Sequence, residues 1–331
     1  MVKIVFLADT HLGFDFSLRP KKERRRRGND FFNNFDKVLD HAKEIDADLL
    51  IHGGDLFYRT KVPAPIVDMV YERIFGFAEA GIPIVIVPGN HESSKLPASL
   101  FLQHPNVYHF TEPQVFKFRF KNQFFDVAGF PCVRNDIKAK LPPIIKEIQP
   151  YLNNESIKLL CMHQSIEGAK VGPSDFTFRY GDDVIPIKDI PAGFDLILSG
   201  HIHRAQILWP SNKAPVIYPG SIERTAFAEK DEEKGFYEIE FDEKRSYGFK
   251  FIPLNSRPMI DILLEKENYT IKGLQDEIAA KIGTIAANSI VRFNMVQKEN
   301  LPLLNASFLD KLVPSTMNYQ ISGLKELYQS N

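Results

Sequence analysis

The sequence predicts an α/β protein, with a large layered domain built around parallel strands and a small α+β domain after it. Five short segments are apolar almost throughout, as expected of strands that are covered on both faces. They are residues 2–8, 48–51, 84–87, 157–162 and 194–198. The first three alternate with two segments of helical periodicity, and this order is typical of a layered domain with a parallel sheet.

Both helices are expected from the spacing of their apolar residues. Over residues 31–45 the apolar side chains recur every 3.6 residues, and Asn29 or Asp30 is the expected N-cap because both side chains accept backbone N–H groups. The same period returns over residues 66–77 after Pro65, a residue suited to the first turn of a helix. The two segments are therefore expected to cover the parallel strands.

After the third strand the hydrophobic pattern changes to an alternation of apolar and polar residues. Phe116, Phe118 and Phe120 alternate with polar neighbours, and a later strand is expected to begin near Phe236 and run to residue 241. We expect these strands to form a second sheet packed against the first. Trp209 and the Phe-rich strands are expected to lie in the core.

A domain boundary is expected near residues 253–258. It separates a domain of residues 1–255 from one of residues 256–331. The smaller domain can be written β-α-β-α-β. Its elements are expected over residues 260–264, 274–282, 290–295, 306–312 and 319–321.

Composition excludes several classes of protein. With 331 residues, 44% hydrophobic and 25% charged, the chain can bury a large core and is not a disordered protein. Its two cysteines, Cys132 and Cys161, allow at most one disulfide, which favours a reducing compartment. No apolar stretch approaches 20 residues and no cleavage site follows the first apolar run, so we expect neither export nor a membrane span. The formal net charge of −1 neither favours nor excludes nucleic acid.

Five short motifs share one arrangement, in which an apolar strand runs into a loop that carries Asp, Asn or His. The motifs are Asp9-Thr10-His11, Gly53-Gly54-Asp55, Gly89-Asn90-His91-Glu92, Met162-His163 and Gly200-His201-Ile202-His203. Ligands of open α/β sheets bind beyond the carboxyl ends of the strands, so these side chains are expected to converge. Each motif alone has an ordinary explanation as a cap, a turn or a coincidence. Because five of the nine histidines occur in these motifs, a metal site is the better explanation of the set.

Seven oxygen and nitrogen donors are too many for one ion. Carboxylate, amide and imidazole together suit Mn, Fe or Zn better than Mg or Ca. Two ions about 3.5–4 Å apart would use all seven donors and would clamp a phosphoryl group from both sides. Asp55 is the expected bridge, because Gly53 and Gly54 before it allow a sharp turn close to the ions. We expect one ion to be held by Asp9, His11 and His203, and the other by Asn90, His163 and His201.

These motifs resemble, in their order along the chain, the motif set of the calcineurin-like metallophosphoesterases. The segments 54–57, 88–91 and 218–224, the last reading Tyr-Pro-Gly-Ser-Ile-Glu-Arg, resemble more closely the SbcD-type DNA repair nucleases. The resemblance covers roughly residues 1–255 through motifs. It implies a four-layer α/β/β/α metallophosphoesterase sandwich, with the small C-terminal domain as a DNA-binding capping domain.

The resemblance also implies an activity, cofactors and partners. The chain would cut DNA in double-strand break repair, as an exonuclease on duplex ends and an endonuclease on single strands. It would use two divalent metal ions, with Mn²⁺ expected, and would work as a homodimer with an SMC-like ATPase of the SbcC type. The expected location is cytoplasmic and nucleoid-associated. A small-molecule phosphodiesterase or phosphatase of the same superfamily is the alternative, and a catalytically silent binding protein is a third.

Three further residues matter for handling phosphate. The resemblance implies that His91 orients the phosphate or protonates the leaving oxygen, and the alternative is that it only positions Asp55 or Asp9. Where many relatives carry a second phosphate-handling histidine, this chain has Tyr58, whose phenol can donate a hydrogen bond without a charge. This leaves the balance of exonuclease and endonuclease action open. Arg224 is expected to contact phosphate or to support the residues that do.

A run of basic residues lies between the first motif and the first helix. Its cations are Lys21, Lys22, Arg24, Arg25, Arg26 and Arg27. Such a run can bind the phosphates of DNA and release their counterions. The alternative is a solvated loop.

Overall fold

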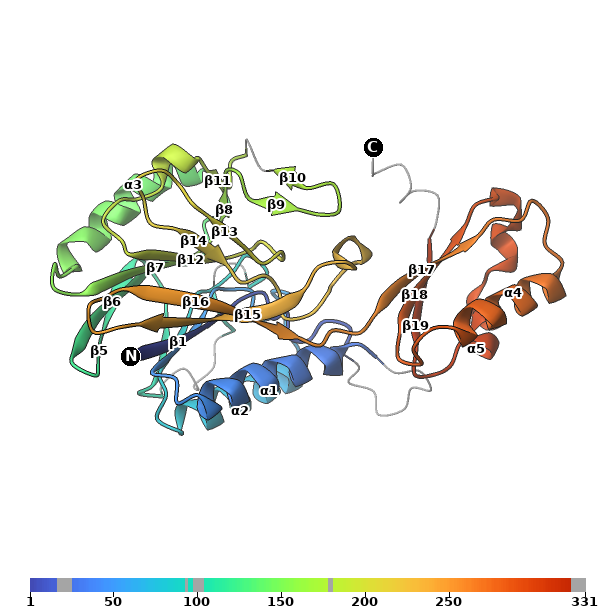
Figure 1. The fold of residues 1–331 in the computed structure, drawn as a ribbon, viewed down its shortest axis with the longest axis horizontal. Helices are drawn as coiled ribbons and strands as arrows, with labels where there is room; N and C mark the ends of the chain where they lie inside the picture. The colour runs from blue at the N-terminus through green and yellow to red at the C-terminus, as the bar shows by residue number, and fades with distance from the viewer. Residues whose placement is uncertain (17–25, 93–94, 98–103, 178–180, 323–331) are drawn as a thin grey trace. The chain divides into compact units, whose positions relative to one another are not determined.

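The computed structural model describes residues 1–16, 26–92, 95–97, 104–177 and 181–322 (Figure 1). The chain divides into two compact units. One is formed by Met1–Phe14 and Gly28–Asn255, and the other by the described residues from Ser256 onward with those of the segment 15–27.

The first unit contains a mixed six-stranded sheet in the order β16-β15-β1-β2-β3-β4. Its strands are β1 (Val2–Leu7), β2 (Leu49–His52), β3 (Ile84–Ile86), β4 (Val107–His109), β15 (Lys234–Phe241) and β16 (Tyr247–Leu254). Strands β1 to β4 are parallel, whereas β15 runs antiparallel to β1, with Val2 opposite Phe241. The first strand of the chain is therefore an inner strand of this sheet.

A second six-stranded sheet has the order β13-β14-β12-β7-β6-β5. Its strands are β5 (Gln114–Phe120), β6 (Gln123–Gly129), β7 (Ile157–His163), β12 (Leu196–Gly200), β13 (Gln206–Leu208) and β14 (Val216–Tyr218). The neighbours β6, β7, β12 and β14 are parallel, and β5 and β13 close the two edges antiparallel. The five strands expected from apolar runs are thus confirmed, and they divide between two sheets.

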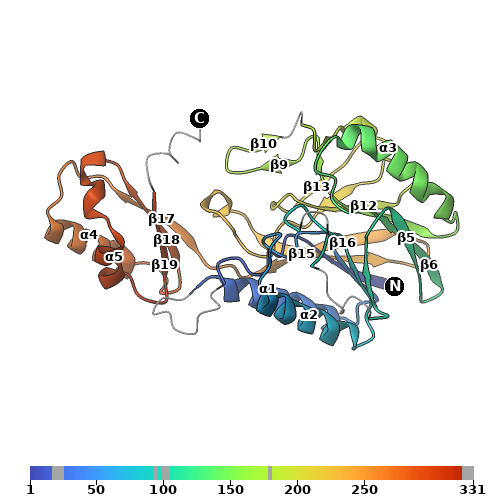
Figure 2. The same cartoon turned by 180° about the vertical axis from the view of Figure 1, so that it is seen from behind.

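The two sheets pack face to face. Phe6 and Ile51 of the first sheet share one apolar core with Leu159 and Leu198 of the second. Helices α1 (Gly28–Glu44) and α2 (Ala64–Ala78) lie on the outer side of the first sheet, and α3 (Ile137–Ile148) lies on the outer side of the second (Figures 1 and 2). The implied four-layer α/β/β/α arrangement is confirmed.

Three sequence expectations about this unit are wrong in detail. The segment ending at residue 241 is β15 of the first sheet and not a strand of the second, because its partner is fixed by a pairing over more than 230 positions that no local pattern reports. Helix α1 begins at Gly28, which places Asn29 and Asp30 inside its first turn, where a carboxylate is also favourable. Trp209 is 66% exposed, since it follows β13 at the edge of its sheet.

The remaining elements are short paired strands and turns of 3₁₀-helix. The paired strands are β8 (Ser165–Ile166) with β11 (Val184–Ile185), and β9 (Lys170–Val171) with β10 (Phe176–Thr177). Turns of 3₁₀-helix cover Gln149–Tyr151, Ile187–Asp189, Phe227–Glu229 and Lys298–Leu303.

The C-terminal unit has the β-α-β-α-β order that its sequence predicts. Its elements are β17 (Met259–Leu264), α4 (Ile271–Gly283), β18 (Ile290–Met295), α5 (Ala306–Leu312) and β19 (Asn318–Ser322). The three strands form one parallel sheet in the order β17-β18-β19. The Thr270 side chain caps α4 and the Asn305 side chain caps α5, each accepting a backbone N–H of the first turn.

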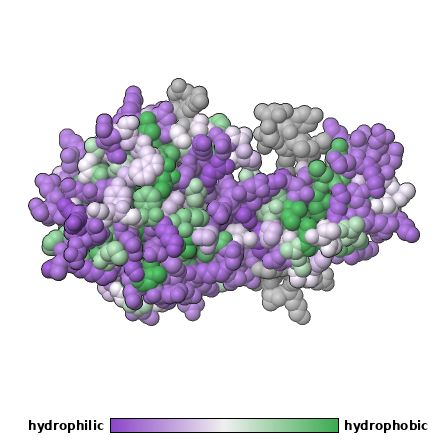
Figure 3. All heavy atoms as spheres, viewed as in Figure 1, coloured by the Kyte–Doolittle hydropathy of each residue, from purple (hydrophilic) through white to green (hydrophobic). Residues whose placement is uncertain are grey.

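Apolar side chains gather on the visible face of the C-terminal unit (Figure 3). In this unit Leu263, Ile271 and Val296 are 48%, 61% and 49% exposed. Among the described residues, no helix has the length and apolar character needed to cross a membrane.

Candidate metal centre

The predicted ligand residues follow strands of both sheets. Asp9 and His11 come after β1, Asp55 after β2 and Asn90 after β3. In the second sheet His163 ends β7, and His201 and His203 follow β12 in an irregular loop. All belong to the first unit, and the structure brings them together at one edge.

The first cluster contains Asp9, His11 and His203, with one ligand atom of each within 4.8 Å of the others. The Nε2 atoms of His11 and His203 are 2.9 Å apart, and Asp9 Oδ1 lies 3.9 Å from His203 Nε2. Asp9 and His11 are almost fully buried. His11 Nδ1 is also buried without a hydrogen-bond partner in the described part of the chain. Two imidazole nitrogens and a carboxylate facing one another suit a shared cation.

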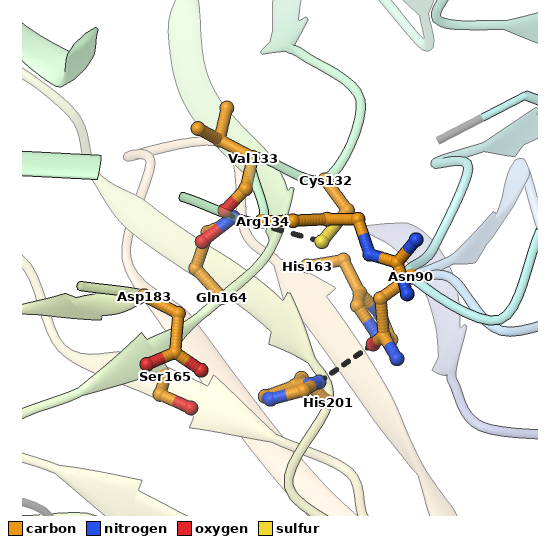
Figure 4. Close-up of a pocket in the computed structure, with 9 residues that line it drawn as sticks. All are labelled: Asn90, Cys132, Val133, Arg134, His163, Gln164, Ser165, Asp183 and His201. Carbon is orange, nitrogen blue, oxygen red and sulfur yellow. Dashed lines mark hydrogen bonds between the residues drawn. The ribbon is translucent and has the colours of Figure 1, made fainter. Parts of the chain in front are cut away.

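The second cluster is centred on the side-chain oxygen of Asn90. Asn90 Oδ1 lies 2.8 Å from His201 Nδ1 and 3.0 Å from His163 Nε2, and both rings are directed toward it (Figure 4). Asp55 Oδ2 lies 3.4 Å from His163 Nε2. Oxygen and imidazole nitrogen again form a donor set that suits a first-row divalent ion.

Asp55 lies between the two clusters. Its carboxylate forms one compact group with His11 and His91 and another with Asp9 and His163. It is therefore within reach of both donor sets, as the prediction of a bridging carboxylate requires. The bridging role itself remains a prediction.

Other contacts orient the imidazoles. His163 Nδ1 donates to the carbonyl oxygen of Gly53 at 2.8 Å, which leaves Nε2 as a lone-pair donor toward Asn90 and Asp55. His203 Nδ1 donates to Glu229 Oε1 at 3.1 Å, which leaves its Nε2 facing His11. Hydrogen bonds of this kind fix the tautomer and the ring orientation of metal-binding histidines.

The electrostatics of the site reflect buried charge. Burial raises the pKa of Asp9 to about 6. Burial opposes protonation of His163, but the nearby Asp55 carboxylate outweighs it and raises the pKa of His163 to about 9. Burial, with the neighbouring His163, lowers the pKa of His201 to about 3. Closely spaced carboxylates and imidazoles in a buried site form an environment that a divalent cation would stabilise.

The backbone is strained at the ligand residues. Asp9, His11, Asp55 and His201 adopt positive φ angles of 52°, 45°, 53° and 85°. Such a conformation costs a non-glycine residue about 1–3 kcal/mol. Hydrogen bonds from Asp9 N to Gly54 O at 2.9 Å and from His11 N to Asp55 O at 3.0 Å hold two of these turns together. Strained residues cluster at functional sites, because the surrounding structure must hold them there.

Two glycines allow the strand-end loops to approach closely. Gly54 has φ 107°, and a Cβ there would lie 2.2 Å from His163 Nδ1. A Cβ on Gly89 would lie 2.1 Å from Asp55 Oδ1. The close approach expected at Gly54 is therefore present, and Gly89 has the same role on the other side of Asp55.

Comparison with known proteins is consistent with this geometry. The sequence matches the family described as calcineurin-like phosphoesterase over residues 2–205, more than half of the chain. The chain belongs to this family. The predicted family is confirmed, and the chain is a hydrolase of the phosphoesterase type with groups of residues suited to divalent metal ions.

Three similar curated proteins are each named DNA double-strand break repair protein Mre11. The protein of Methanococcus maripaludis is 27% identical over 99% of this chain and 90% of its own length. That of Archaeoglobus fulgidus is 25% identical over 85% of this chain and 65% of its own length, and that of Saccharolobus solfataricus is 23% identical over 98% and 85%. A solved dimetal phosphatase from Danio rerio is 10% identical, with 73% of this chain and 93% of the phosphatase covered and a TM-score of 0.44.

In this phosphoesterase His91 lies at the rim of the metal centre. Its Nδ1 donates to the carbonyl oxygen of Tyr58 at 2.5 Å, and its Nε2 lies 3.8 Å from Asp55 Oδ2. The His91 side chain is 37% exposed, whereas Asp55 is buried. The Tyr58 ring packs edge-on against Phe14 and lies 5.7 Å from the His91 ring. The site thus presents His91 to solvent beside the clusters.

Arg224 is linked to the first cluster through Glu229. Its guanidinium donates to the carbonyl oxygens of Glu229 and Glu232 at 3.1 and 2.8 Å. The Glu229 carboxylate in turn contacts His203 and the buried Lys234, whose Nζ lies 2.7 Å from Glu229 Oε2. Burial would raise the pKa of Glu229, but the hydrogen bond from His203 and the charge of Lys234 hold it well below its usual value. The structure therefore shows Arg224 bonded to the loop that carries Glu229.

Sequence reasoning missed Glu229 and Lys234. Both are charged residues in or beside a turn, without an apolar period, and they follow the motif that ends at residue 224. Glu92 belongs to the motif of residues 89–92, but its role is not evident from the sequence. Its carboxylate accepts the backbone N–H groups of Phe57 at 2.7 Å and Gly89 at 2.6 Å, and burial raises its pKa to about 8. Glu92 thus ties together the loops that carry Asp55 and Asn90.

The basic run is only partly described. Lys21, Lys22, Arg24 and Arg25 lie outside the described residues. Arg26 forms an ion pair with Asp15. Arg27 is 4% exposed, and its backbone N–H donates to Asp15 Oδ2 at 3.0 Å. Because Arg27 is buried, it is a poorer candidate for DNA binding than the rest of the run.

Proposed function

We propose that this phosphoesterase is a metal-dependent DNA nuclease of double-strand break repair. The main support is the pair of donor clusters that share Asp55, found in a chain whose Mre11-named relatives align over most of its length. A buried pair of clusters is suited to in-line displacement at a phosphodiester, because charge develops on both the attacking and the leaving oxygen.

Two divalent ions, with Mn²⁺ expected, would occupy the clusters. Asp9, His11 and His203 would hold one ion, Asn90, His163 and His201 the other, and Asp55 would contact both. When bound, such ions polarise the phosphate and supply a water that is nucleophilic at neutral pH. The mixed nitrogen and oxygen donors support Mn²⁺ over Mg²⁺.

His91 is proposed to act on the phosphate. The hydrogen bond to Tyr58 O fixes Nδ1 as the N–H donor, so that Nε2 faces the space beside Asp55. When protonated, this nitrogen can donate to a phosphate oxygen or give its proton to the leaving oxygen. Tyr58 and Arg224 are proposed to act indirectly, through the orientation of His91 and of Glu229.

The finer features of the function follow from the resemblance and from the names of the relatives. We propose exonuclease action on duplex ends and endonuclease action on single strands, and a C-terminal unit that acts as a DNA-binding cap. The proposed partners are an SMC-like ATPase of the SbcC type and a second copy of this chain. The proposed location is cytoplasmic and nucleoid-associated.

The test uses the full chain with and without Mn²⁺ on three substrates: single-stranded plasmid, blunt duplex and a nitrophenyl phosphodiester. The proposal expects metal-dependent degradation of both DNA substrates. Hydrolysis of the small ester alone would replace the nuclease with a small-molecule phosphodiesterase. No turnover of any substrate would favour a catalytically silent binding protein.

A further inference from the structure

A cavity of about 130 Å³ opens beside the second cluster (Figure 4). Its lining residues are Asn90, Cys132, Val133, Arg134, His163, Gln164, Ser165, Asp183 and His201. Asn90, His163 and His201 are predicted metal ligands, so the cavity continues directly from the metal centre. The other lining residues have no part in the centre itself.

Three polar side chains of this cavity have no hydrogen-bond or ion-pair partner among the described residues. Ser165 is fully buried, and its Oγ makes no hydrogen bond within the described residues. Arg134 and Asp183 form no hydrogen bond or ion pair with any residue that the structure describes. A buried hydroxyl is costly to leave unpaired, and here it shares a cavity with the exposed cation of Arg134 and the partly buried carboxylate of Asp183. This combination indicates a polar ligand.

The walls of the cavity are held in place. Cys132 N donates to Pro88 O at 2.9 Å, which attaches the loop of Arg134 to the loop of Asn90. Gln164 Nε2 donates to Val133 O at 2.9 Å. Ser165 pairs with Val184 in the short parallel ladder of β8 and β11, next to Asp183. A preformed cavity with a few convergent polar groups is typical of a binding site.

We propose that this cavity binds the nucleobase of the nucleotide whose phosphate lies at the second cluster. The inference rests on the proposed function and names the substrate group that the site selects. Arg134 pairs with the phosphate, and Asp183 and Ser165 hydrogen-bond the polar edge of the base. The volume of about 130 Å³ is well below the roughly 300–1,000 Å³ of drug-sized sites, so it suits a single ring system.

The inference has a consequence for the substrate. A base inside a helix is stacked and paired, so it must be freed before it can enter the cavity. Cleavage is therefore expected to be faster at frayed or mismatched duplex ends than at fully paired ends. Equal rates at both kinds of end would contradict the proposed cavity.

The direct test measures binding of deoxynucleoside monophosphates and of inorganic phosphate to the full chain with Mn²⁺, by calorimetry. The wild type is expected to prefer the nucleotides over phosphate. Arg134→Ala and Asp183→Asn are expected to weaken nucleotide binding roughly tenfold or more, the usual scale for a charge-assisted contact. Lys138→Ala and Asp182→Asn are matched controls, since both residues are exposed and neither lines the cavity. Nucleotide affinities that stay at the wild-type value in the first two variants would overturn the inference.

Ser165→Ala separates a ligand contact from a structural role. Because Oγ has no partner, its removal is expected to leave the thermal midpoint unchanged or higher, whereas nucleotide affinity falls several-fold. A lower midpoint with unchanged affinity would assign Ser165 to the fold and overturn its part in the site.

Two failures remain distinguishable. If the wild type hydrolyses only the nitrophenyl ester yet prefers nucleotides over phosphate, the nuclease proposal fails and the base-binding cavity stands. If the wild type degrades DNA while both charge variants keep the nucleotide preference and the ratio of DNA to small-ester turnover, the cavity proposal fails alone.

Discussion

The edge that carries the donor clusters and the C-terminal unit are built in different ways. Within residues 256–322 no residue has a positive φ angle, and helices α4 and α5 begin with the side-chain caps Thr270 and Asn305. At the clustered edge, Asp9 and Asp55 are among the ligand residues with positive φ. The C-terminal unit therefore follows local preferences, whereas the edge departs from them, and departures of this kind are expected at functional sites.

Buried charge differs in the same way. In the C-terminal unit the buried Arg257 donates to neutral acceptors, among them Asn288 O at 2.6 Å and the Asn318 side chain at 2.7 Å. At the clustered edge Asp55 faces imidazoles and lies near a second carboxylate, Asp9. One region satisfies its charge internally, and the other keeps donor atoms available to a ligand.

The largest effect is expected from Asp55→Asn, which removes the carboxylate charge that lies between the two clusters. Turnover with Mn²⁺ is expected to fall roughly a thousandfold, the upper range for loss of one group that stabilises developing charge. Phosphodiester kinetics and Mn²⁺ calorimetry measure the change. Asp68→Asn, at an exposed position of α2, is the control and should retain full activity. Parental turnover in Asp55→Asn would rule out the bridging role.

Glu229→Gln is expected to destabilise the protein by about 3 kcal/mol at pH 7, because it leaves the buried Lys234 without one of its partners. The pKa of Glu229 is depressed in the folded protein, so its stabilisation is fully present above its usual value of 4.5 and is lost progressively as the pH falls from there toward the depressed pKa. Denaturant unfolding at pH 7 and pH 4 should show the gap to wild type shrinking. Exposed Glu233→Gln serves as the control, and a gap that grows in acid would contradict the assigned interaction.

Gly89→Ala is expected to cost about 1–3 kcal/mol, since its Cβ would meet Asp55 N at 2.3 Å and Asp55 Oδ1 at 2.1 Å. Mn²⁺ affinity should fall with it. Gly76→Ala is the matched control, because a Cβ at this position of α2 meets nothing within 4 Å and should stabilise the helix by about 0.5–1 kcal/mol. Thermal unfolding of both variants checks the pair. Equal stability of Gly89→Ala and Gly76→Ala would show that the loops of Gly89 and Asp55 can move apart without cost.

The smallest effect is expected in the C-terminal unit. Thr270→Ala removes the acceptor for Gly273 N and should cost about 1 kcal/mol, whereas Thr270→Ser should keep the cap. Hydrolysis of the nitrophenyl ester should not change in either variant, because no donor residue lies in this unit. Denaturant midpoints and ester turnover measure the two effects. A loss of ester turnover would show that the C-terminal unit contributes to the reaction at the donor clusters.

The sequence was most informative where local pattern determines structure. The C-terminal elements were predicted nearly residue by residue, because apolar period and turn residues coincide there. The convergence of the seven predicted donor residues was also anticipated, since each follows a strand and bears a metal-binding group, and their binding of metal stays a prediction. The partner of β15 was wrong, because strand pairing between distant segments leaves no local trace.

The residues that orient the ligands were the main omission. Glu229 and Lys234 act through burial and through each other, and a charged residue in a turn ordinarily indicates solvent. Ser165 is a similar case, because its hydroxyl is buried without a hydrogen-bond partner in the described part of the chain. Such properties exist only in three dimensions, so sequence pattern cannot report them.

The position of β1 inside its sheet delays the completion of that sheet during biosynthesis. Val2 and its neighbours leave the ribosome well before their antiparallel partner, which ends at Phe241. At about 5–20 residues per second, roughly 10–50 s separate the two ends of this pairing. During that interval this edge of β1 lacks its antiparallel partner, and an unpaired apolar strand edge can pair with other chains.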